Sequence, residues 1–212
     1  MTTTERRTRT LVVVSAGLSN PSSTRKLADL LTDATTAELR GLGSDVIVEV
    51  IELRDLAQEM TSHLLSGFPS EHLAEVLETV THADGLIAVT PVFSASYSGL
   101  FKMFVDLIDE GKLAGTPTLI AATAGSARHS LVLDHALRPL FSYLKAIVVP
   151  TGVFAASDDW GTAGESDDSG ESGLTGRVQR AGAELAQLVA AHTPAQRTSD
   201  FDVVDFESLL QG

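Results

Sequence analysis

Short apolar runs alternate along this chain with longer segments in which apolar residues recur every three or four positions. The short runs do not alternate cleanly between polar and apolar positions, which is typical of strands covered on both faces. We therefore predict strands at TLVVVS (10–15), DVIVEVI (45–51), GLIAVT (85–90), PTLIAAT (117–123) and AIVVPTGVFA (146–155).

The segments between these runs have the periodicity of amphipathic helices. We expect Ser70 to be the N-cap of the second helix and Pro139 to kink the fourth, and we predict helices over 22–43, 70–83, 98–109, 130–145 and 173–192. Strands that alternate with helices indicate βαβ units with right-handed crossovers. The expected fold class is α/β, a doubly wound parallel sheet of five strands with helices on both faces.

The composition of the chain fits one core of this kind. Of 212 residues 43% are hydrophobic but only 5% aromatic, so small aliphatic side chains must fill the interior. We expect one domain over 1–192 and a short amphipathic tail over 193–212, which docks on its own domain or on a neighbouring subunit. Residues 157–175 are rich in acids, Gly and Ser, and we expect an exposed, mobile loop there. A contact of Trp160 with a partner is the alternative.

The charge and the cysteine count narrow the function classes. Fifteen Lys and Arg stand against 28 Asp and Glu, a net charge of −13, which argues against nucleic acid or a membrane surface as the main partner. The chain has no Cys, which excludes disulfides, thiol catalysis and iron–sulfur or Cys–zinc sites. Neither a secretory signal nor an apolar run of about 18 residues is present, so we expect a cytoplasmic protein.

Small and hydroxylic residues follow three of the five predicted strands. The loops are SAGLSNPSST (15–24), TPVFSASYSG (90–99) and TAGSARHS (123–130), whereas the second strand ends in plain ELRDL. If the strands are ordered 2-1-3-4-5, these three loops line one crevice where the strand order reverses. Hydroxyls and free N–H groups at the start of the first helix suit a phosphate, although an ordinary N-cap explains them equally well. The Gly-Lys-Ser/Thr of a P-loop and the G-x-G-x-x-G of a dinucleotide-binding fold are both absent.

Four segments resemble one known family. They are SNPSSTRKLA, IELRDL, TPVFSASYSGLFKMFVDLI and TAGSARHSLVLDHALRPLFSYLKAIVVPTGVFA, and they extend over most of residues 10–156. The chain resembles the flavodoxin-like NADPH-dependent FMN reductase family, in particular the branch that supplies reduced flavin to two-component monooxygenases. Phe93 stands where many members have Tyr, and Ala124-Gly125 stands where many have Gly-Gly.

The resemblance implies a set of cofactor-binding residues. The FMN phosphate would lie on Ser19, Ser22, Ser23 and Thr24. The edge of the flavin ring would run along Pro91, Val92, Phe93 and Ser94, with Ala95 and Ser96 closing the turn. The pyrimidine side of the ring would face Thr123, Gly125 and Ser126. Arg128 or Arg25 would meet the 2′-phosphate of NADPH, unless each is only a solvated charge at a helix end. We expect no catalytic side chain and no metal, because the flavin itself carries the electronics of hydride transfer.

The function expected from the resemblance is an NAD(P)H-dependent FMN reductase. It would act as a homodimer or homotetramer and pass reduced FMN to a flavin-dependent monooxygenase. A flavodoxin-type electron carrier and a quinone or azo reductase with bound FMN are the alternatives. A preference for NADPH or NADH, and FMN as substrate or as prosthetic group, stay open. Lys102 and Asp106 are spaced for an ion pair within one helix or across a subunit interface.

Overall fold

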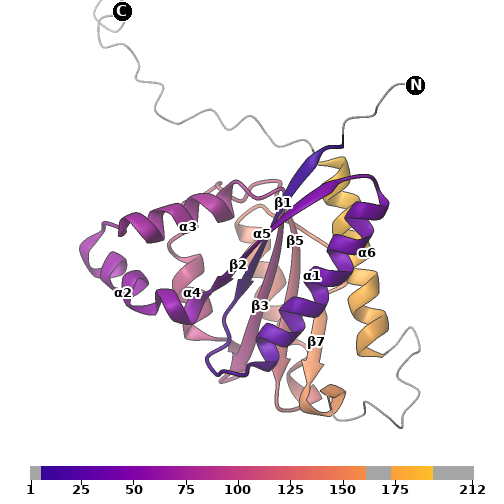
Figure 1. The fold of residues 1–212 in the computed structure, drawn as a ribbon. Coiled ribbons are helices and arrows are strands. Elements are labelled where there is room, and N and C mark those ends of the chain that lie inside the picture. The colour runs from indigo at the N-terminus through magenta and orange to yellow at the C-terminus, as the bar shows by residue number, and fades with distance from the viewer. Residues whose placement is uncertain (1–5, 161–172, 193–212) are drawn as a thin grey trace, which may run out of the picture.

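The computed structural model describes residues 6–160 and 173–192, which form one twisted sheet between two layers of helices (Figure 1). The remaining parts of the acidic segment and the whole tail at 193–212 lie outside the described residues. Strand order in the sheet is β2-β1-β3-β5-β6, with β4 paired to β3 and β7 paired to β5. The strands are β1 Thr8–Ser15, β2 Asp45–Glu52, β3 Gly85–Phe93, β4 Ser96–Tyr97, β5 Pro117–Ala124, β6 Ile147–Val148 and β7 Val153–Ala156.

The described residues contain seven strands, so the predicted number of five is wrong. The order of the five predicted segments is the expected one, and all pairs except β3 with β4 are parallel. The fifth segment pairs with β5 in two pieces, because the chain leaves the ladder at Pro150–Gly152. Arg138 donates to the carbonyls of Val149 and Pro150, and Glu184 accepts from the N–H and hydroxyl of Thr151. These side chains satisfy the backbone groups that the broken strand leaves free.

Residues of one strand alternate between two cores, one on each face of the sheet. Val12 and Val14 of β1 pack with the helices between β2 and β6, whereas Leu11 and Val13 pack with the first and last helices. The first layer holds α2 Ala57–Ser66, α3 Glu71–Thr81, α4 Gly99–Val105 and α5 Arg138–Tyr143, and the second holds α1 Ser23–Gly41 and α6 Leu174–Ala191 (Figure 1).

Side-chain caps set the starts of three helices. Ser22, Ser70 and Ser98 each accept a hydrogen bond from a backbone N–H three residues further on, which confirms the predicted cap at Ser70. Helix α2 was not predicted. It follows a short 3₁₀ turn, Leu53–Leu56, in the segment that the sequence pattern left as a plain connection.

The predicted helix over 130–145 changes its helix type along its length. A π-helical turn, Leu133–Leu137, runs directly into α5, and Pro139 lies in the first turn of α5. Pro139 has no N–H to donate to the turn before it, and that turn is π-helical. The helix type therefore changes directly in front of the proline, where the kink was predicted.

A buried arginine joins three elements at the amino end of the sheet. Arg9 in β1 is 1% exposed, and its terminal nitrogens donate to Asp84 at 2.9 Å and to the carbonyls of Ala190 and His192 at 2.9 and 2.8 Å. Asp84 also accepts from the N–H of Thr10 at 2.8 Å. These bonds fasten the end of α6 and the start of β3 to β1.

The described residues offer neither a membrane-spanning helix nor a cluster of metal ligands. None of the described helices combines the length and the apolar character needed to cross a bilayer. Within the same residues, His, Asp and Glu side chains nowhere gather in a group of three or more that could hold a metal ion.

Candidate functional site

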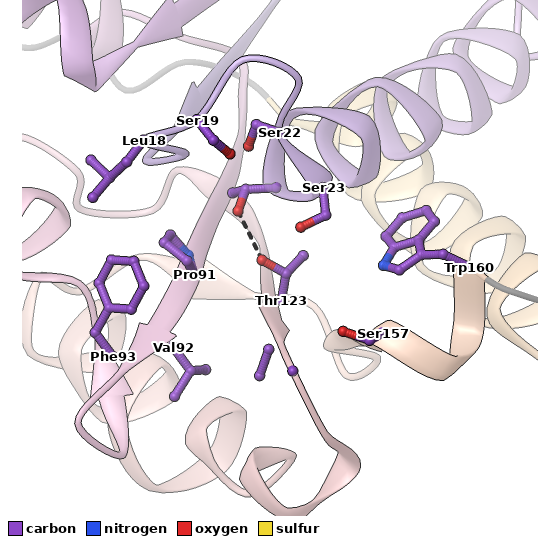
Figure 2. A pocket seen from close by; sticks show the side chains of 13 residues that line it. Leu18, Ser19, Ser22, Ser23, Pro91, Val92, Phe93, Thr123, Ser157 and Trp160 are labelled. Atoms are coloured by element: carbon purple, nitrogen blue, oxygen red, sulfur yellow. Dashed lines mark hydrogen bonds between the residues drawn. The ribbon is translucent and has the colours of Figure 1, made fainter.

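The carboxyl ends of β1, β3, β5 and β7 surround a pocket of about 370 Å³ (Figure 2). Its lining is hydroxylic and apolar, and none of the described lining residues carries an ionisable side chain. The residues that line it are Leu18, Ser19, Ser22, Ser23, Thr24, Pro91, Val92, Phe93, Thr123, Ala124, Gly125, Ser157 and Trp160.

The turn between β1 and α1 brings hydroxyls to the start of a 19-residue helix. The hydroxyl of Ser22 caps α1, and the hydroxyls of Thr24 and Thr123 lie 2.8 Å apart in a buried bond that ties α1 to β5 (Figure 2). A Cβ on Gly17 would lie 2.2 Å from the Ser22 hydroxyl oxygen, so only glycine lets the chain approach this closely. Hydroxyls and helix N–H groups in this arrangement suit an anionic group such as a phosphate.

The second wall of the pocket is the hairpin of β3 and β4. Val92 pairs with Tyr97 and Phe93 with Ser96, so Ser94 and Ala95 form a two-residue turn. Their φ angles are 49° and 66°, as a type I′ turn requires, although neither residue is glycine. Such angles cost about 1 kcal/mol per residue, and the Thr90 hydroxyl helps to hold the turn by accepting from the N–H of Ser98 at 3.0 Å. Ahead of this turn, half-buried Pro91 and Val92 and exposed Phe93 offer a flat apolar wall.

The third wall comes from the segment after β7, on the opposite side of the pocket from Phe93 (Figure 2). A 3₁₀ turn, Ser157–Trp160, is held by Asp159, which accepts from the N–H of Ala156 at 2.6 Å and from Arg177 at 3.1 Å. The ammonium of Lys26 lies 4.6 Å from the centroid of the Trp160 ring. This side of the pocket therefore combines elements from both ends of the domain.

A second pocket, of about 260 Å³, lies on the other side of the Ser19–Ser22 turn and has a charged lining. Arg25 donates to Asp29 and to Glu52, both at 2.7 Å, and these hydrogen bonds raise the pKa of Arg25. Arg54 donates to the carbonyl of Ser19 at 3.1 Å, which braces the turn from behind. The two carboxylates neutralise Arg25, so it is poorly suited to a phosphate.

The structure brings most of the predicted cofactor residues into the first pocket. Those in its lining are Ser19, Ser22, Ser23, Thr24, Pro91, Val92, Phe93, Thr123 and Gly125. The lining does not include the other five predicted residues, Ser94, Ala95, Ser96, Ser126 and Arg128. Of these, Ser94 and Ser126 follow lining residues directly in the chain, and Ser96 pairs with Phe93. Four lining residues were not predicted, Leu18, Ala124, Ser157 and Trp160. The first two are neighbours of predicted residues, and Trp160 was considered only as a partner contact.

The strand order and the position of the pocket define a flavodoxin-like α/β protein. The WrbA-like flavodoxin of Agrobacterium tumefaciens has this fold, with a TM-score of 0.57 at 17% identity over 87% of this chain and 99% of that one.

The chain belongs to the NADPH-dependent FMN reductase family, whose sequence profile matches residues 9–161. It is 44% identical over 150 residues to an FMN reductase (NADPH) of Pseudomonas aeruginosa, covering 71% of this chain and 78% of that protein. It is 39% identical over 189 residues to the NADH-dependent FMN reductase SfnE of Pseudomonas putida, covering 89% and 97%. An oxidoreductase from Corynebacterium diphtheriae has a TM-score of 0.82 at 49% identity, over 88% of this chain and all of that one.

The pocket fits FMN on the chemistry of its donors. Uncharged hydroxyls and helix N–H groups at one end match a phosphate, and the close approach at Gly17 leaves that end open. Pro91, Val92 and Phe93 match a planar ring that needs contact with backbone and apolar atoms.

Proposed function

We propose that this protein is an NAD(P)H-dependent FMN reductase that binds FMN in the strand-end pocket. One observation carries the proposal: a hydroxyl-lined helix start and a flat apolar wall share one pocket, in a chain of this family. In this assignment Ser19, Ser22 and Ser23 bind the phosphate, and the wall at Pro91–Phe93 orients the ring. Thr24 and Thr123 hold these two parts together through their buried hydrogen bond.

The described lining residues position the bound flavin and exclude water from it, and they transfer no proton. Every titratable side chain is missing from the described lining of the pocket. When bound, FMN would supply the hydride-accepting centre, and a reduced nicotinamide would supply the hydride. Single alanine substitutions of Ser19, Ser23 or Arg128 should therefore raise the apparent KM for flavin or nicotinamide nucleotide more than they lower kcat.

We propose further that the reduced FMN passes to a flavin-dependent monooxygenase and that the protein works in the cytoplasm as a homodimer or homotetramer. The four segments that resemble the monooxygenase-linked branch support this, and the wide pocket with exposed Phe93 suits a flavin that leaves after reduction. The nucleotide preference is not part of the proposal, because the named relatives include both an NADPH and an NADH enzyme.

Steady-state oxidation of NADPH and NADH tests the proposal. We expect oxidation that depends on added FMN and shows ternary-complex kinetics with free FMN as a substrate. Ping-pong kinetics with retained flavin, and faster turnover with a quinone, would instead indicate a quinone reductase. A protein that binds FMN but never oxidises either nucleotide would be an electron carrier, and the proposed function would be wrong.

A further inference from the structure

Lys26 lines the second pocket, and among the described residues no carboxylate pairs with its ammonium, which is also true of Arg128 after β5. Lys26 belongs to the same first turn of α1 as Ser23 and Thr24, and its ammonium lies 4.6 Å from the centroid of the Trp160 ring. Its neighbours differ in this respect, since Arg25 meets two carboxylates and the Nε of Arg54 lies 3.5 Å from Asp55. An ammonium on an aromatic face keeps its full charge, which stays available to an anion.

Trp160 is a fixed support for this ammonium. The bonds of Asp159 to the N–H of Ala156 and to Arg177 anchor the turn that carries the ring. The ring lines the first pocket and contacts the ammonium of Lys26, and Lys26 shares the lining of the second pocket with Ser19 and Ser22, so the ammonium lies near the serine turn. A long Lys side chain has the reach to lean from the ring towards a bound phosphate.

The charge balance of the site makes this cation significant. A flavin phosphate brings close to two negative charges at neutral pH, and the chain already carries −13. The hydroxyls and N–H groups of the lining are neutral, so they solvate the phosphate without cancelling its charge. An uncompensated cation at the edge of this cradle therefore favours a phosphorylated ligand over the same ligand without phosphate.

We propose that Lys26, held on Trp160, determines the specificity of the site for FMN over riboflavin. The inference rests on the proposed function. It assigns a role to two residues outside the expected cofactor set, and it concerns binding, so it is testable without turnover.

Trp160 is the single tryptophan of the chain, so its fluorescence reports the site alone. Titrations of the wild type and of Lys26→Met with FMN and with riboflavin, followed by quenching of this emission, give four dissociation constants. We expect Lys26→Met to weaken FMN binding about tenfold, as for loss of one charged contact, and to change riboflavin binding less than about twofold. Lys26→Arg should keep FMN binding within about threefold, because guanidinium is also a cation that stacks on indole.

Two further measurements separate a charge effect from a packing effect. Added salt should weaken FMN binding more steeply in the wild type than in Lys26→Met, and should leave riboflavin binding unchanged. Trp160→Phe should keep most of the FMN preference and Trp160→Leu should lose it, measured by the fluorescence of the flavin. The matched control is Lys112→Met, which removes an exposed charge from the turns before β5, at the other end of the sheet, and should alter neither constant.

The outcomes also separate this inference from the proposed function. If FMN is bound and reduced but Lys26→Met weakens both flavins equally, or neither, the specificity role is wrong and the reductase stands. If FMN binding is selective but NADPH and NADH are never oxidised, the reductase is wrong and the role of Lys26 stands. A wild-type protein that quenches with neither flavin overturns both.

Discussion

The two ends of the sheet use polar groups in opposite ways. At the amino end, Arg9 is buried, and its terminal nitrogens are bound to Asp84 and to two carbonyls at the end of α6. At the carboxyl end, the described lining of the pocket is hydroxylic and apolar without a charged side chain, and Lys26 has no carboxylate partner among the described residues. The same sheet therefore has polar groups that bind one another at its amino end and polar groups that face a pocket at its carboxyl end.

The amino end of the sheet therefore contributes to the stability of the fold, and the carboxyl end contributes to ligand binding. A buried charge is tolerated only where its partners are supplied within the fold, as they are around Arg9, and losing one partner is then expensive. A site that binds an anion needs hydrogen-bond donors that are available to the ligand, such as the hydroxyls and N–H groups of the Ser19–Ser23 region. Substitutions at the amino end should therefore change unfolding without changing affinity, and those at the carboxyl end should change affinity first.

The largest effect is expected from Arg9→Met. It leaves the Asp84 carboxylate without its cation and frees the carbonyls of Ala190 and His192, so we expect the free energy of unfolding to fall by about 3–5 kcal/mol. Urea unfolding monitored by circular dichroism measures the loss, and the FMN dissociation constant of the folded protein should stay within about twofold of the wild type. The double variant Arg9→Met with Asp84→Asn should recover part of the stability. A loss below about 1 kcal/mol would show that the network contributes no more than a surface pair.

Gly17→Ala should have the next largest effect, at the opposite end. The new methyl group would lie 2.2 Å from the Ser22 hydroxyl oxygen, so the cap and the turn must shift. We expect FMN binding to weaken at least tenfold, roughly the loss of one well-placed charged contact, with a stability cost of about 1 kcal/mol from the disturbed cap. Titration with FMN and urea unfolding give the two numbers.

Gly41→Ala is the matched control for this change, because it lies at the other end of α1 and its Cβ would meet nothing within 4 Å. It should leave FMN binding unchanged. Equal loss of affinity in both variants would argue against a specific role for the turn at Gly17.

A smaller effect on the free energy of unfolding is expected from the Thr24 and Thr123 hydroxyl pair, which is buried and also lines the pocket. Either Thr→Val change leaves the other hydroxyl buried without its partner, at a cost of about 1–2 kcal/mol. The double variant Thr24→Val with Thr123→Val removes both hydroxyls and should be more stable than the sum of the single variants predicts. Urea unfolding of the four proteins forms the cycle, and simple additivity would contradict the bond.

The sequence predicted those parts of the fold that depend on local pattern. Ser70 was recognisable as a cap from the apolar stripe behind it, and the alternation of strands with helices indicated a parallel sheet. The order 2-1-3-4-5 was a hypothesis, which the five predicted segments confirm. The division of the fifth strand was less accessible, because it depends on Arg138 and Glu184, which come from other elements to bind Val149–Thr151. Helix α2 was missed because its start is a 3₁₀ turn that continues directly from β2.

The candidate site shows the same limit. The three loops rich in small residues were identified because each follows a strand, and parallel strands end at one edge. Trp160 could not be placed, because its position depends on the pairing of β7 with β5 and on a lysine 134 positions earlier in the chain. For Arg25, the partner Asp29 follows from i, i+4 spacing, whereas Glu52 comes from β2 and is evident only in the fold.

The smallest effect is expected from Asp106→Asn at the C-cap of α4, an exposed position that tests the comparison at the surface. Lys102 donates to Asp106 at 2.7 Å, as its spacing predicted, but both side chains are more than 40% exposed. The hydrogen bond to Asp106 raises the pKa of Lys102 above its ordinary 10.5. The pair therefore stabilises the fold at neutral pH, and this contribution is lost as the pH rises through the raised pKa.

We expect Asp106→Asn to cost about 0.3 kcal/mol in urea unfolding at pH 7 and nothing in high salt. Solvent screens this pair, whereas the fold shields the Arg9–Asp84 pair from solvent. The contribution of an ion pair to the free energy of unfolding should therefore differ about tenfold between the two places. A loss above about 1 kcal/mol, accompanied by a change in sedimentation velocity, would mean that Asp106 is not a surface residue in solution. Its exposure in the single chain would then mark the interface between subunits.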